Sequence, residues 1–100
     1  MTVNIRYVSM DASEALSAYT EKKLEPLSKK YEFLITCDVA FKLDNNQKEQ
    51  GHVCNMELSL PGPRIFASSN EKNFEMAVKE TIADLERQLE KRKHQFSTHL

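Results

Sequence analysis

Residues 35–43, Ile-Thr-Cys-Asp-Val-Ala-Phe-Lys-Leu, are the strongest strand signal in the chain and decide its fold. Every second residue is a larger apolar one, which is the period of a strand with one buried face. A loop without apolar residues follows at residues 44–51, and the alternation returns at residues 54–60. Two such strands joined by one loop predict an antiparallel pair.

Two shorter strands are predicted on either side of this pair. Residues 3–7 alternate in the same way, and residues 64–68 follow Pro61-Gly62-Pro63, a turn that cannot continue a strand ladder. The sheet is therefore expected to have four strands.

Two stretches have the spacing of three and four residues that is typical of an amphipathic helix. The first spans residues 16–27; Asp11 or Ser13 is its expected cap, and Pro26 is expected to kink it or end it. The second is expected to begin at Ser69-Asn70. Its apolar face consists of Phe74, Val78, Ile82, Leu85 and Leu89.

The order of these elements predicts an α+β fold of two layers, β-α-β-β-β-α, which resembles double-stranded-RNA-binding domains (dsRBD-like). A four-stranded sheet has two helices packed on one face, its first two strands are parallel, and its other face meets water. We expect one domain over residues 1–96 and a frayed tail over residues 97–100. The predicted core consists of Ile5, Leu16, Leu24, Leu27, Val39, Phe41, Met56, Leu58, Phe74, Val78, Ile82, Leu85 and Leu89.

Composition argues against several classes of function. The chain has only two glycines, so a Gly-rich phosphate loop is excluded. No apolar run approaches the ~20 residues of a membrane span and no signal segment is present, so we expect a cytoplasmic protein without a membrane partner. Cys37 and Cys54 are expected to be buried, reduced thiols. The three histidines have no metal-ligand spacing with them, so no metal and no other cofactor is predicted.

Catalytic residues are not recognisable in the chain. It has no Gly-x-Ser-x-Gly elbow, and both cysteines fall at inward strand positions. The glutamates lie on polar helix faces, where solvation and weak i,i+4 pairing are expected. We therefore expect that the protein is not an enzyme.

The cations are concentrated although the formal net charge is only -1. Most of the cations lie in two helical stretches, namely Lys22, Lys23, Lys29 and Lys30 in the first and Arg87, Lys91, Arg92 and Lys93 in the second. The acids are expected elsewhere. Side by side, the two helices would present a cationic surface that binds the phosphates of a folded RNA. The alternative is two solvated helix ends, where cations meet the helix dipole. The sheet's outward residues include one aromatic, Phe66, so stacking of bases on the sheet is not expected.

Both helical stretches also resemble a known family, the bacterial ribosome hibernation-promoting factors, also called ribosome-associated inhibitors or sigma-54 modulation proteins. The first resembles that family's first helix through Lys23-Leu24, Leu27 and Lys29-Lys30-Tyr31. The second is similar to its second helix through Ala77-Val78 and Leu85-Glu86-Arg87-Gln88-Leu89. Together with the order of elements and the short length, the resemblance covers about residues 1–95.

The resemblance implies a stationary-phase, stress-response inhibitor of translation. Such a protein binds the small (30S) ribosomal subunit at the decoding centre, overlaps the A- and P-site path of tRNA and mRNA, and keeps idle ribosomes inactive. Basic residues of both helices would contact 16S rRNA. Carried over to this chain they are Lys22, Lys23, Lys29, Lys30, Lys79, Arg87, Lys91 and Lys93.

Three positions depart from the family pattern. Pro26 and Asp84 stand where a basic residue is usual, and Lys79 stands where Asp is frequent. We therefore expect weaker binding than in the family's more basic members. Because the chain stops at Leu100, without the long C-terminal dimerisation domain of some members, pairing of ribosomes is expected to need a second factor.

A second class of function is an alternative to binding the small ribosomal subunit. DNA is not an expected partner in either case. The near-neutral charge and Asp84 favour a regulatory protein-interaction module without direct ribosome binding. In that case a sheet edge or the acidic loop at residues 44–50 would engage a regulatory protein.

Overall fold

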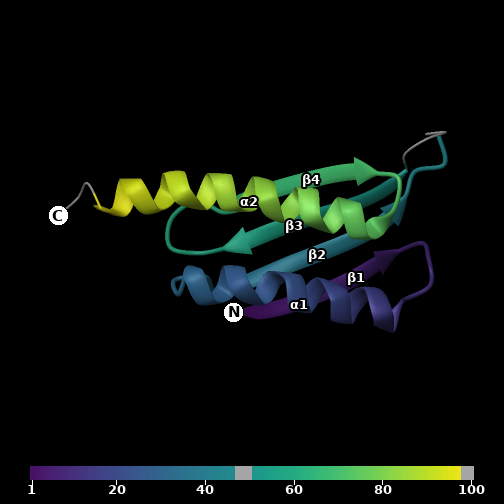
Figure 1. The fold of residues 1–100 in the computed structure, drawn as a ribbon, viewed down its shortest axis with the longest axis horizontal. Coiled ribbons are helices and arrows are strands. Elements are labelled where there is room, and N and C mark those ends of the chain that lie inside the picture. Colours follow the sequence, from purple (N-terminus) through teal and green to yellow (C-terminus); the bar gives the residue numbers. More distant parts are fainter. Residues whose placement is uncertain (47–50, 98–100) are drawn as a thin grey trace.

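A computed structural model describes residues 1–46 and 51–97 of the protein. Its elements are β1 (Thr2–Val8), α1 (Glu14–Lys30), β2 (Thr36–Leu43), β3 (His52–Ser59), β4 (Ile65–Glu71) and α2 (Phe74–Ser97). The strands form one mixed sheet in the order β1-β2-β3-β4, in which β1 is parallel to β2 and the other neighbours are antiparallel. Both helices lie on one face of this sheet (Figure 1). The predicted α+β class, element order and two-layer arrangement are confirmed.

The alternation along each strand places the core between sheet and helices. The register aligns Ile5, Val39, Met56 and Ala67 across the four strands, and the last three are buried. Ile5 packs partly buried against the core, as do Phe74 and Ile82, and the other predicted core residues are buried. The two ends of the decisive alternation differ, because Ile35 and Leu43 are 58% and 49% exposed. Ile35 precedes β2 and Leu43 is its last residue, so neither lies under a helix.

Helix α1 begins at its serine cap and continues through its proline. The Ser13 hydroxyl accepts a hydrogen bond from the backbone N–H of Leu16 at 3.1 Å, so Ser13 and not Asp11 is the N-cap. Of the two alternatives for Pro26, a kink or the end of the helix, the end is excluded because α1 extends to Lys30. Proline removes only one backbone donor, and beyond it the N–H of Tyr31 still bonds to the carbonyl of Leu27 at 3.0 Å.

Helix α2 begins later than predicted. The prediction of a start at Ser69-Asn70 is wrong, because both residues pair with β3 and β4 continues to Glu71. The side chain of Asn73 caps α2 instead, accepting from the N–H of Met76 at 2.8 Å. Strand pairing thus prevails over a local capping preference. Residues 47–50 of the predicted acidic loop and residues 98–100 of the predicted tail lie outside the described residues.

Both cysteines are buried and free, as predicted. Burial raises the pKa of the Cys37 thiol to about 12 and that of Cys54 to about 11, so neither is a ready nucleophile at neutral pH. Across residues 1–46 and 51–97 no three His, Cys, Asp or Glu side chains gather as a metal site would need. Within the same ranges, neither helix combines the length and apolar character of a membrane span.

Candidate nucleic-acid interface

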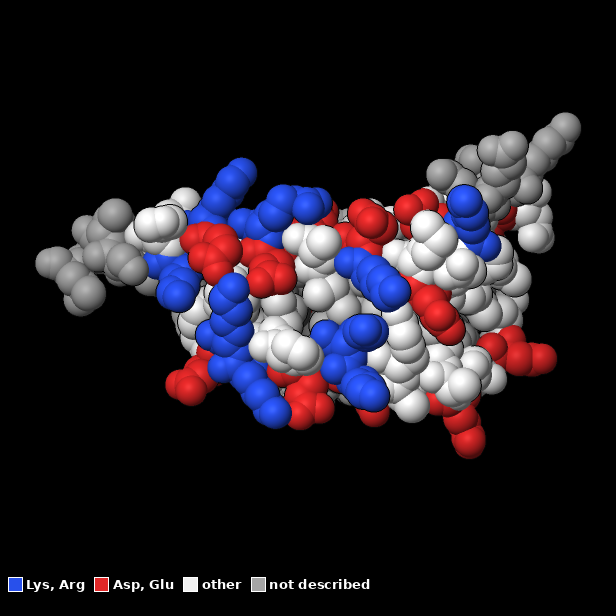
Figure 2. All heavy atoms as spheres, in the orientation of Figure 1, with Lys and Arg blue, Asp and Glu red and all other residues white. Residues whose placement is uncertain are grey.

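All eight predicted contact residues lie on the two helices, and all eight are exposed. Helices α1 and α2 pack side by side and run in the same direction, so that their C-terminal halves meet at one end of the molecule (Figure 1). Figure 2 shows this helical face, with basic side chains over both helices and acidic side chains among them. The fold therefore brings the two predicted clusters onto a single face.

On α1 the four lysines form two rows. Lys23 and Lys30 are seven residues apart, and both line a groove of ≈ 170 Å³ between the helices, opposite Ile82 and Glu86. Lys22 and Lys29 precede them by one residue each. A step of about 100° turns this second row away from the groove and toward solvent. Both rows exist because α1 continues through its proline.

On α2 the charges also divide between two sides. Ile82 and Glu86 line the groove, which marks the side that faces α1. The groove side carries charges at spacings of seven, four and three residues, namely Lys79, Glu86, Glu90 and Lys93. Arg87 and Lys91 are four residues apart and lie on a side turned away from α1. The eight cations thus cover both helices and do not converge on one cleft.

The prediction that the acids lie away from the cationic clusters is wrong. Within α1, Lys29 Nζ lies 2.9 Å from a carboxylate oxygen of Glu25, and this lysine holds the pKa of that carboxyl below its usual value. Within α2, Arg87 lies 3.7 Å from Asp84. Both pairs are largely exposed, and such pairs stabilise a fold very little. A phosphate can therefore compete for either cation.

A third group of acids bridges the helices. Lys30 Nζ lies 3.1 Å from Glu86 and 3.2 Å from Glu90, and the Tyr31 hydroxyl donates a hydrogen bond to Glu90. The Tyr31 hydrogen bond, and then Lys30, hold the pKa of Glu90 below its usual value, whereas the two carboxylates raise the pKa of Lys30. Sequence reasoning assigned Glu86 and Glu90 to solvated surface. It missed them because their partners are more than 50 residues away, and no i,i+4 rule reaches that far.

Three of the eight cations have no ion pair or hydrogen bond with another described residue, namely Lys22, Lys79 and Lys91. Their donors are free for an external anion. Lys23 is in a different position, because its Nζ lies 5.5 Å from the centre of the Tyr19 ring, within the range of a cation–π contact. Phosphate binding is therefore easiest at the three unpaired lysines.

Arg92 belongs to the cationic cluster of α2, but its side chain holds α2 against a turn of the sheet. Its guanidinium donates to the carbonyls of Pro61 at 3.2 Å and Pro63 at 2.8 Å, which ties α2 to the turn between β3 and β4. Gly62, between the prolines, has φ +91, and a Cβ there would come within 3.0 Å of Arg92 Nη1. The turn therefore needs glycine at this position. Sequence spacing could not predict a contact across 31 residues.

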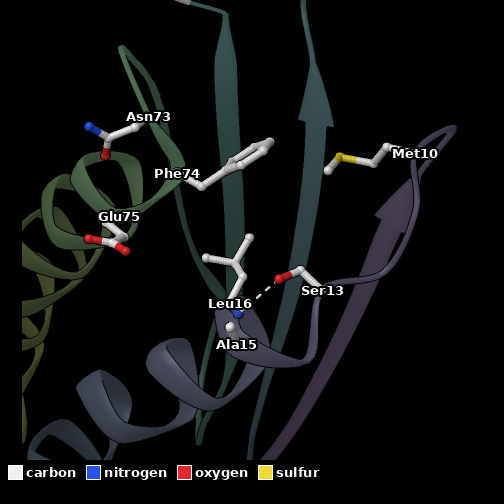
Figure 3. A pocket seen from close by; sticks show the side chains of 7 residues that line it. All are labelled: Met10, Ser13, Ala15, Leu16, Asn73, Phe74 and Glu75. Carbon is white, nitrogen blue, oxygen red and sulfur yellow. Dashed lines mark hydrogen bonds between the residues drawn. The ribbon is translucent and has the colours of Figure 1, made fainter.

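The opposite end of the helical face holds a cavity of ≈ 580 Å³ where both helices begin (Figure 3). Among the described residues its lining contains no lysine or arginine; these residues are Met10, Ser13, Ala15, Leu16, Asn73, Phe74 and Glu75. Ser13 and Asn73 already use their side chains to cap the helices. The described residues of the cavity thus offer no cation to hold a phosphate, and none of the eight candidate cations lines it.

A family model and two solved structures each match nearly the whole chain. Residues 3–97 match the model of the family described as sigma 54 modulation protein / S30EA ribosomal protein. A solved ribosomal subunit interface protein from Coxiella burnetii is 26% identical, with a TM-score of 0.83 over 94% of this chain and 99% of that chain. The N-terminal domain of Protein Y from Thermus thermophilus is 18% identical, with a TM-score of 0.77 over 91% of this chain and 98% of that chain, which is a likeness of fold.

Proposed function

We propose, from the premise that this chain belongs to the sigma 54 modulation protein / S30EA ribosomal protein family, that it inhibits translation by binding the small ribosomal subunit. The family is ribosome-associated, and the similar protein from Coxiella burnetii is named for the ribosomal subunit interface. In this proposal the protein occupies the decoding centre and contacts 16S rRNA. It would cover the A- and P-site path and keep idle ribosomes inactive.

The observation that carries this proposal is the single face formed by the two parallel helices. Lys22 on α1 and Lys79 and Lys91 on α2 are exposed and unpaired among the described residues. Ammonium groups of this kind bind phosphates and release the counterions of the RNA, which favours association at low salt. Such contacts position a protein on a folded RNA without reading its bases.

The low net charge limits what long-range attraction can contribute. At a formal net charge of -1 the whole molecule does not attract RNA. Binding must therefore come from the local face, and the exposed pairs of Lys29 and Arg87 would exchange their carboxylates for phosphates on contact. We expect the affinity to fall steeply as salt rises.

The proposed surface can be tested by co-sedimentation with purified small subunits at low salt. The variant Lys22→Glu/Lys91→Glu reverses one exposed cation on each helix. A matched control, Arg6→Glu/Lys42→Glu, makes the same change of charge on the bare sheet face. We expect the helical variant to lose at least about 30-fold in affinity and the control to lose less than about three-fold. Equal losses would refute the assignment of the surface.

The proposed site can be tested by competition. Small subunits that already hold mRNA and a P-site tRNA should not bind the protein, because both would occupy the same channel. Simultaneous binding would place the protein elsewhere on the subunit and refute the decoding-centre site. Pairing of ribosomes with the help of a second factor stays a prediction.

A further inference from the structure

Where the C-terminal half of α1 meets α2, four side chains form one polar cluster, which we call the interhelical clamp: Lys30, Tyr31, Glu86 and Glu90. Lys30 Nζ lies 3.1 Å from Glu86 and 3.2 Å from Glu90, so one ammonium group joins two carboxylates of the neighbouring helix. The Tyr31 hydroxyl donates to Glu90 as well. Both residues at the end of α1 are thereby attached to α2.

The clamp is anchored on its α1 side. Tyr31 is only 1% exposed, and its ring meets that of Phe33 edge to face with centroids 6.0 Å apart. Its backbone N–H also closes the last turn of α1 by bonding to Leu27. Because the tyrosine ring is held by packing, its hydroxyl is a fixed point for Glu90. The position of α2 against α1 is therefore defined at this end.

Two carboxylates in the middle of an RNA-binding face need an explanation. On electrostatic grounds they repel phosphates, and their loss should strengthen binding. Lys29 offers a contrast, since its acidic partner Glu25 belongs to its own helix and has no second ion pair among the described residues. Glu86 and Glu90 instead connect two helices, each of which carries its own unpaired lysines. Their presence is explained if the connection matters more to binding than the repulsion.

We propose that the interhelical clamp positions the two helices for RNA binding, and that Lys30 is a positioning residue and not a phosphate ligand. This inference rests on the proposed function and removes Lys30 from its eight predicted contacts. The clamp holds Lys22 and Lys23 at a constant spacing from Lys79 and Lys91, so that both helices engage one folded RNA together. A binding surface that is held in its bound arrangement before contact loses less entropy on binding.

The test compares two double variants that change the charge equally. Glu86→Gln/Glu90→Gln removes both carboxylates of the clamp and raises the net charge by two. The control Glu21→Gln/Glu80→Gln does the same at exposed glutamates for which no ion pair is present among the described residues. We expect the control to bind small subunits at least as tightly as the wild type, and the clamp variant to bind about three-fold more weakly despite its added charge. A clamp variant that binds as tightly as the control would overturn the inference.

A second measurement follows the spacing of the helices without RNA. Spin labels at Glu32→Cys and His94→Cys report the distance between the ends of α1 and α2. Cys37 and Cys54 are buried and should not react. The clamp variant should broaden the distribution of distances, and the control should not. An unchanged distribution in the clamp variant would overturn the inference, whether or not the protein binds ribosomes.

Replacement of Lys30 tests whether the clamp needs its cation. Lys30→Arg keeps a cation between the two carboxylates and should bind like the wild type, whereas Lys30→Gln should bind about as weakly as the clamp variant. If Lys30→Gln binds like the wild type, the clamp has no role in positioning. If the wild type itself does not bind small subunits, the proposed function fails, and the label distances still decide whether the clamp holds the helices.

Discussion

The helical face and the bare sheet face of this domain carry charge in different ways. On the sheet face, polar side chains of neighbouring elements satisfy each other: Asn4 donates to Asp38 at 3.0 Å, and Arg64 donates to Glu57 at 3.0 Å. On the helical face, several cations point to solvent without a partner among the described residues. Unpaired cations also occur on the sheet face, where Arg6 and Lys42 have no ion pair or hydrogen bond with another described residue. The helical face differs because its unpaired cations lie on two helices that pack side by side.

The difference follows from the geometry of the two kinds of element. Neighbouring strands hold opposed side chains about 5 Å apart, so that two polar residues in register meet, as Asn4 and Asp38 do. A helix turns about 100° per residue, and the residues opposite its buried side have no neighbouring element to meet. The sheet face also offers only Phe66, 57% exposed, for stacking among the described outward residues.

The largest effect is expected when α2 loses packing on the sheet, because the helical face depends on that packing. Leu85 is fully buried in the core under α2. Leu85→Ala should lower the free energy of unfolding by about 2–5 kcal/mol, because it removes buried apolar contacts and leaves a cavity. Urea denaturation measures this loss. A change below about 1 kcal/mol would mean that α2 is not held by this core.

Single neutralisations should sharpen the contrast. Lys22→Gln on the helical face should lower the slope of log affinity against log salt by about 0.7–0.9, which corresponds to one lost phosphate contact. Lys42→Gln on the sheet face removes the same charge and should leave the slope unchanged. Titrations of small subunits at several salt concentrations give both slopes. Equal slopes in the two variants would remove the distinction between the faces.

The interhelical clamp should make stability depend on pH in the acid range. The pKa of Glu90 lies below its ordinary value of 4.5 in the folded protein, because the Tyr31 hydroxyl and Lys30 favour its charged form. A lowered folded pKa gives stability that is present above the unfolded value and lost as pH falls through the folded value. The urea midpoint of the wild type should therefore exceed that of Glu90→Gln modestly at neutral pH, and the two should converge as pH falls below 4.5 and through the lowered folded pKa. A difference that persists in acid would contradict this account.

The smallest effect is expected for the one aromatic side chain of the sheet face. Phe66→Ala should change the affinity for small subunits by less than about two-fold. Stacking of a base on an aromatic ring contributes about 1–3 kcal/mol, so a sheet that bound bases would lose much more. A loss of ten-fold or more would show that the sheet face takes part in binding.

Much of the fold was predictable because strand and helix periods are local. The alternation at residues 35–43 and 54–60 placed Val39 and Met56 in the core, and the structure confirms both. The errors lie at element boundaries, where tertiary pairing decides. Asn70 has a cap-like side chain, but it lies in β4 and accepts a hydrogen bond from the N–H of Gly51 at 2.6 Å.

The candidate site was predictable only as a set of positions. The eight cations were assigned from two local clusters and a family resemblance, and they all belong to the two helices that cover one face of the sheet. The pairs within one helix, Lys29 with Glu25 and Arg87 with Asp84, follow the i,i+4 and i,i+3 spacing along the chain, whereas pairs between distant segments could not be predicted. The partners of Lys30 and Arg92 come from segments more than 25 residues away, and spacing along one helix contains no information about them.

The amino-acid sequence by itself determined the order of the elements, the buried side of each and the family, since all three depend on residues close together in the chain. The tertiary structure alone decided which charges are paired between the two helices. An ammonium group is open to phosphate or closed by carboxylate according to distances of about 3 Å between helices, and those distances arise only when the two helices pack on the same sheet.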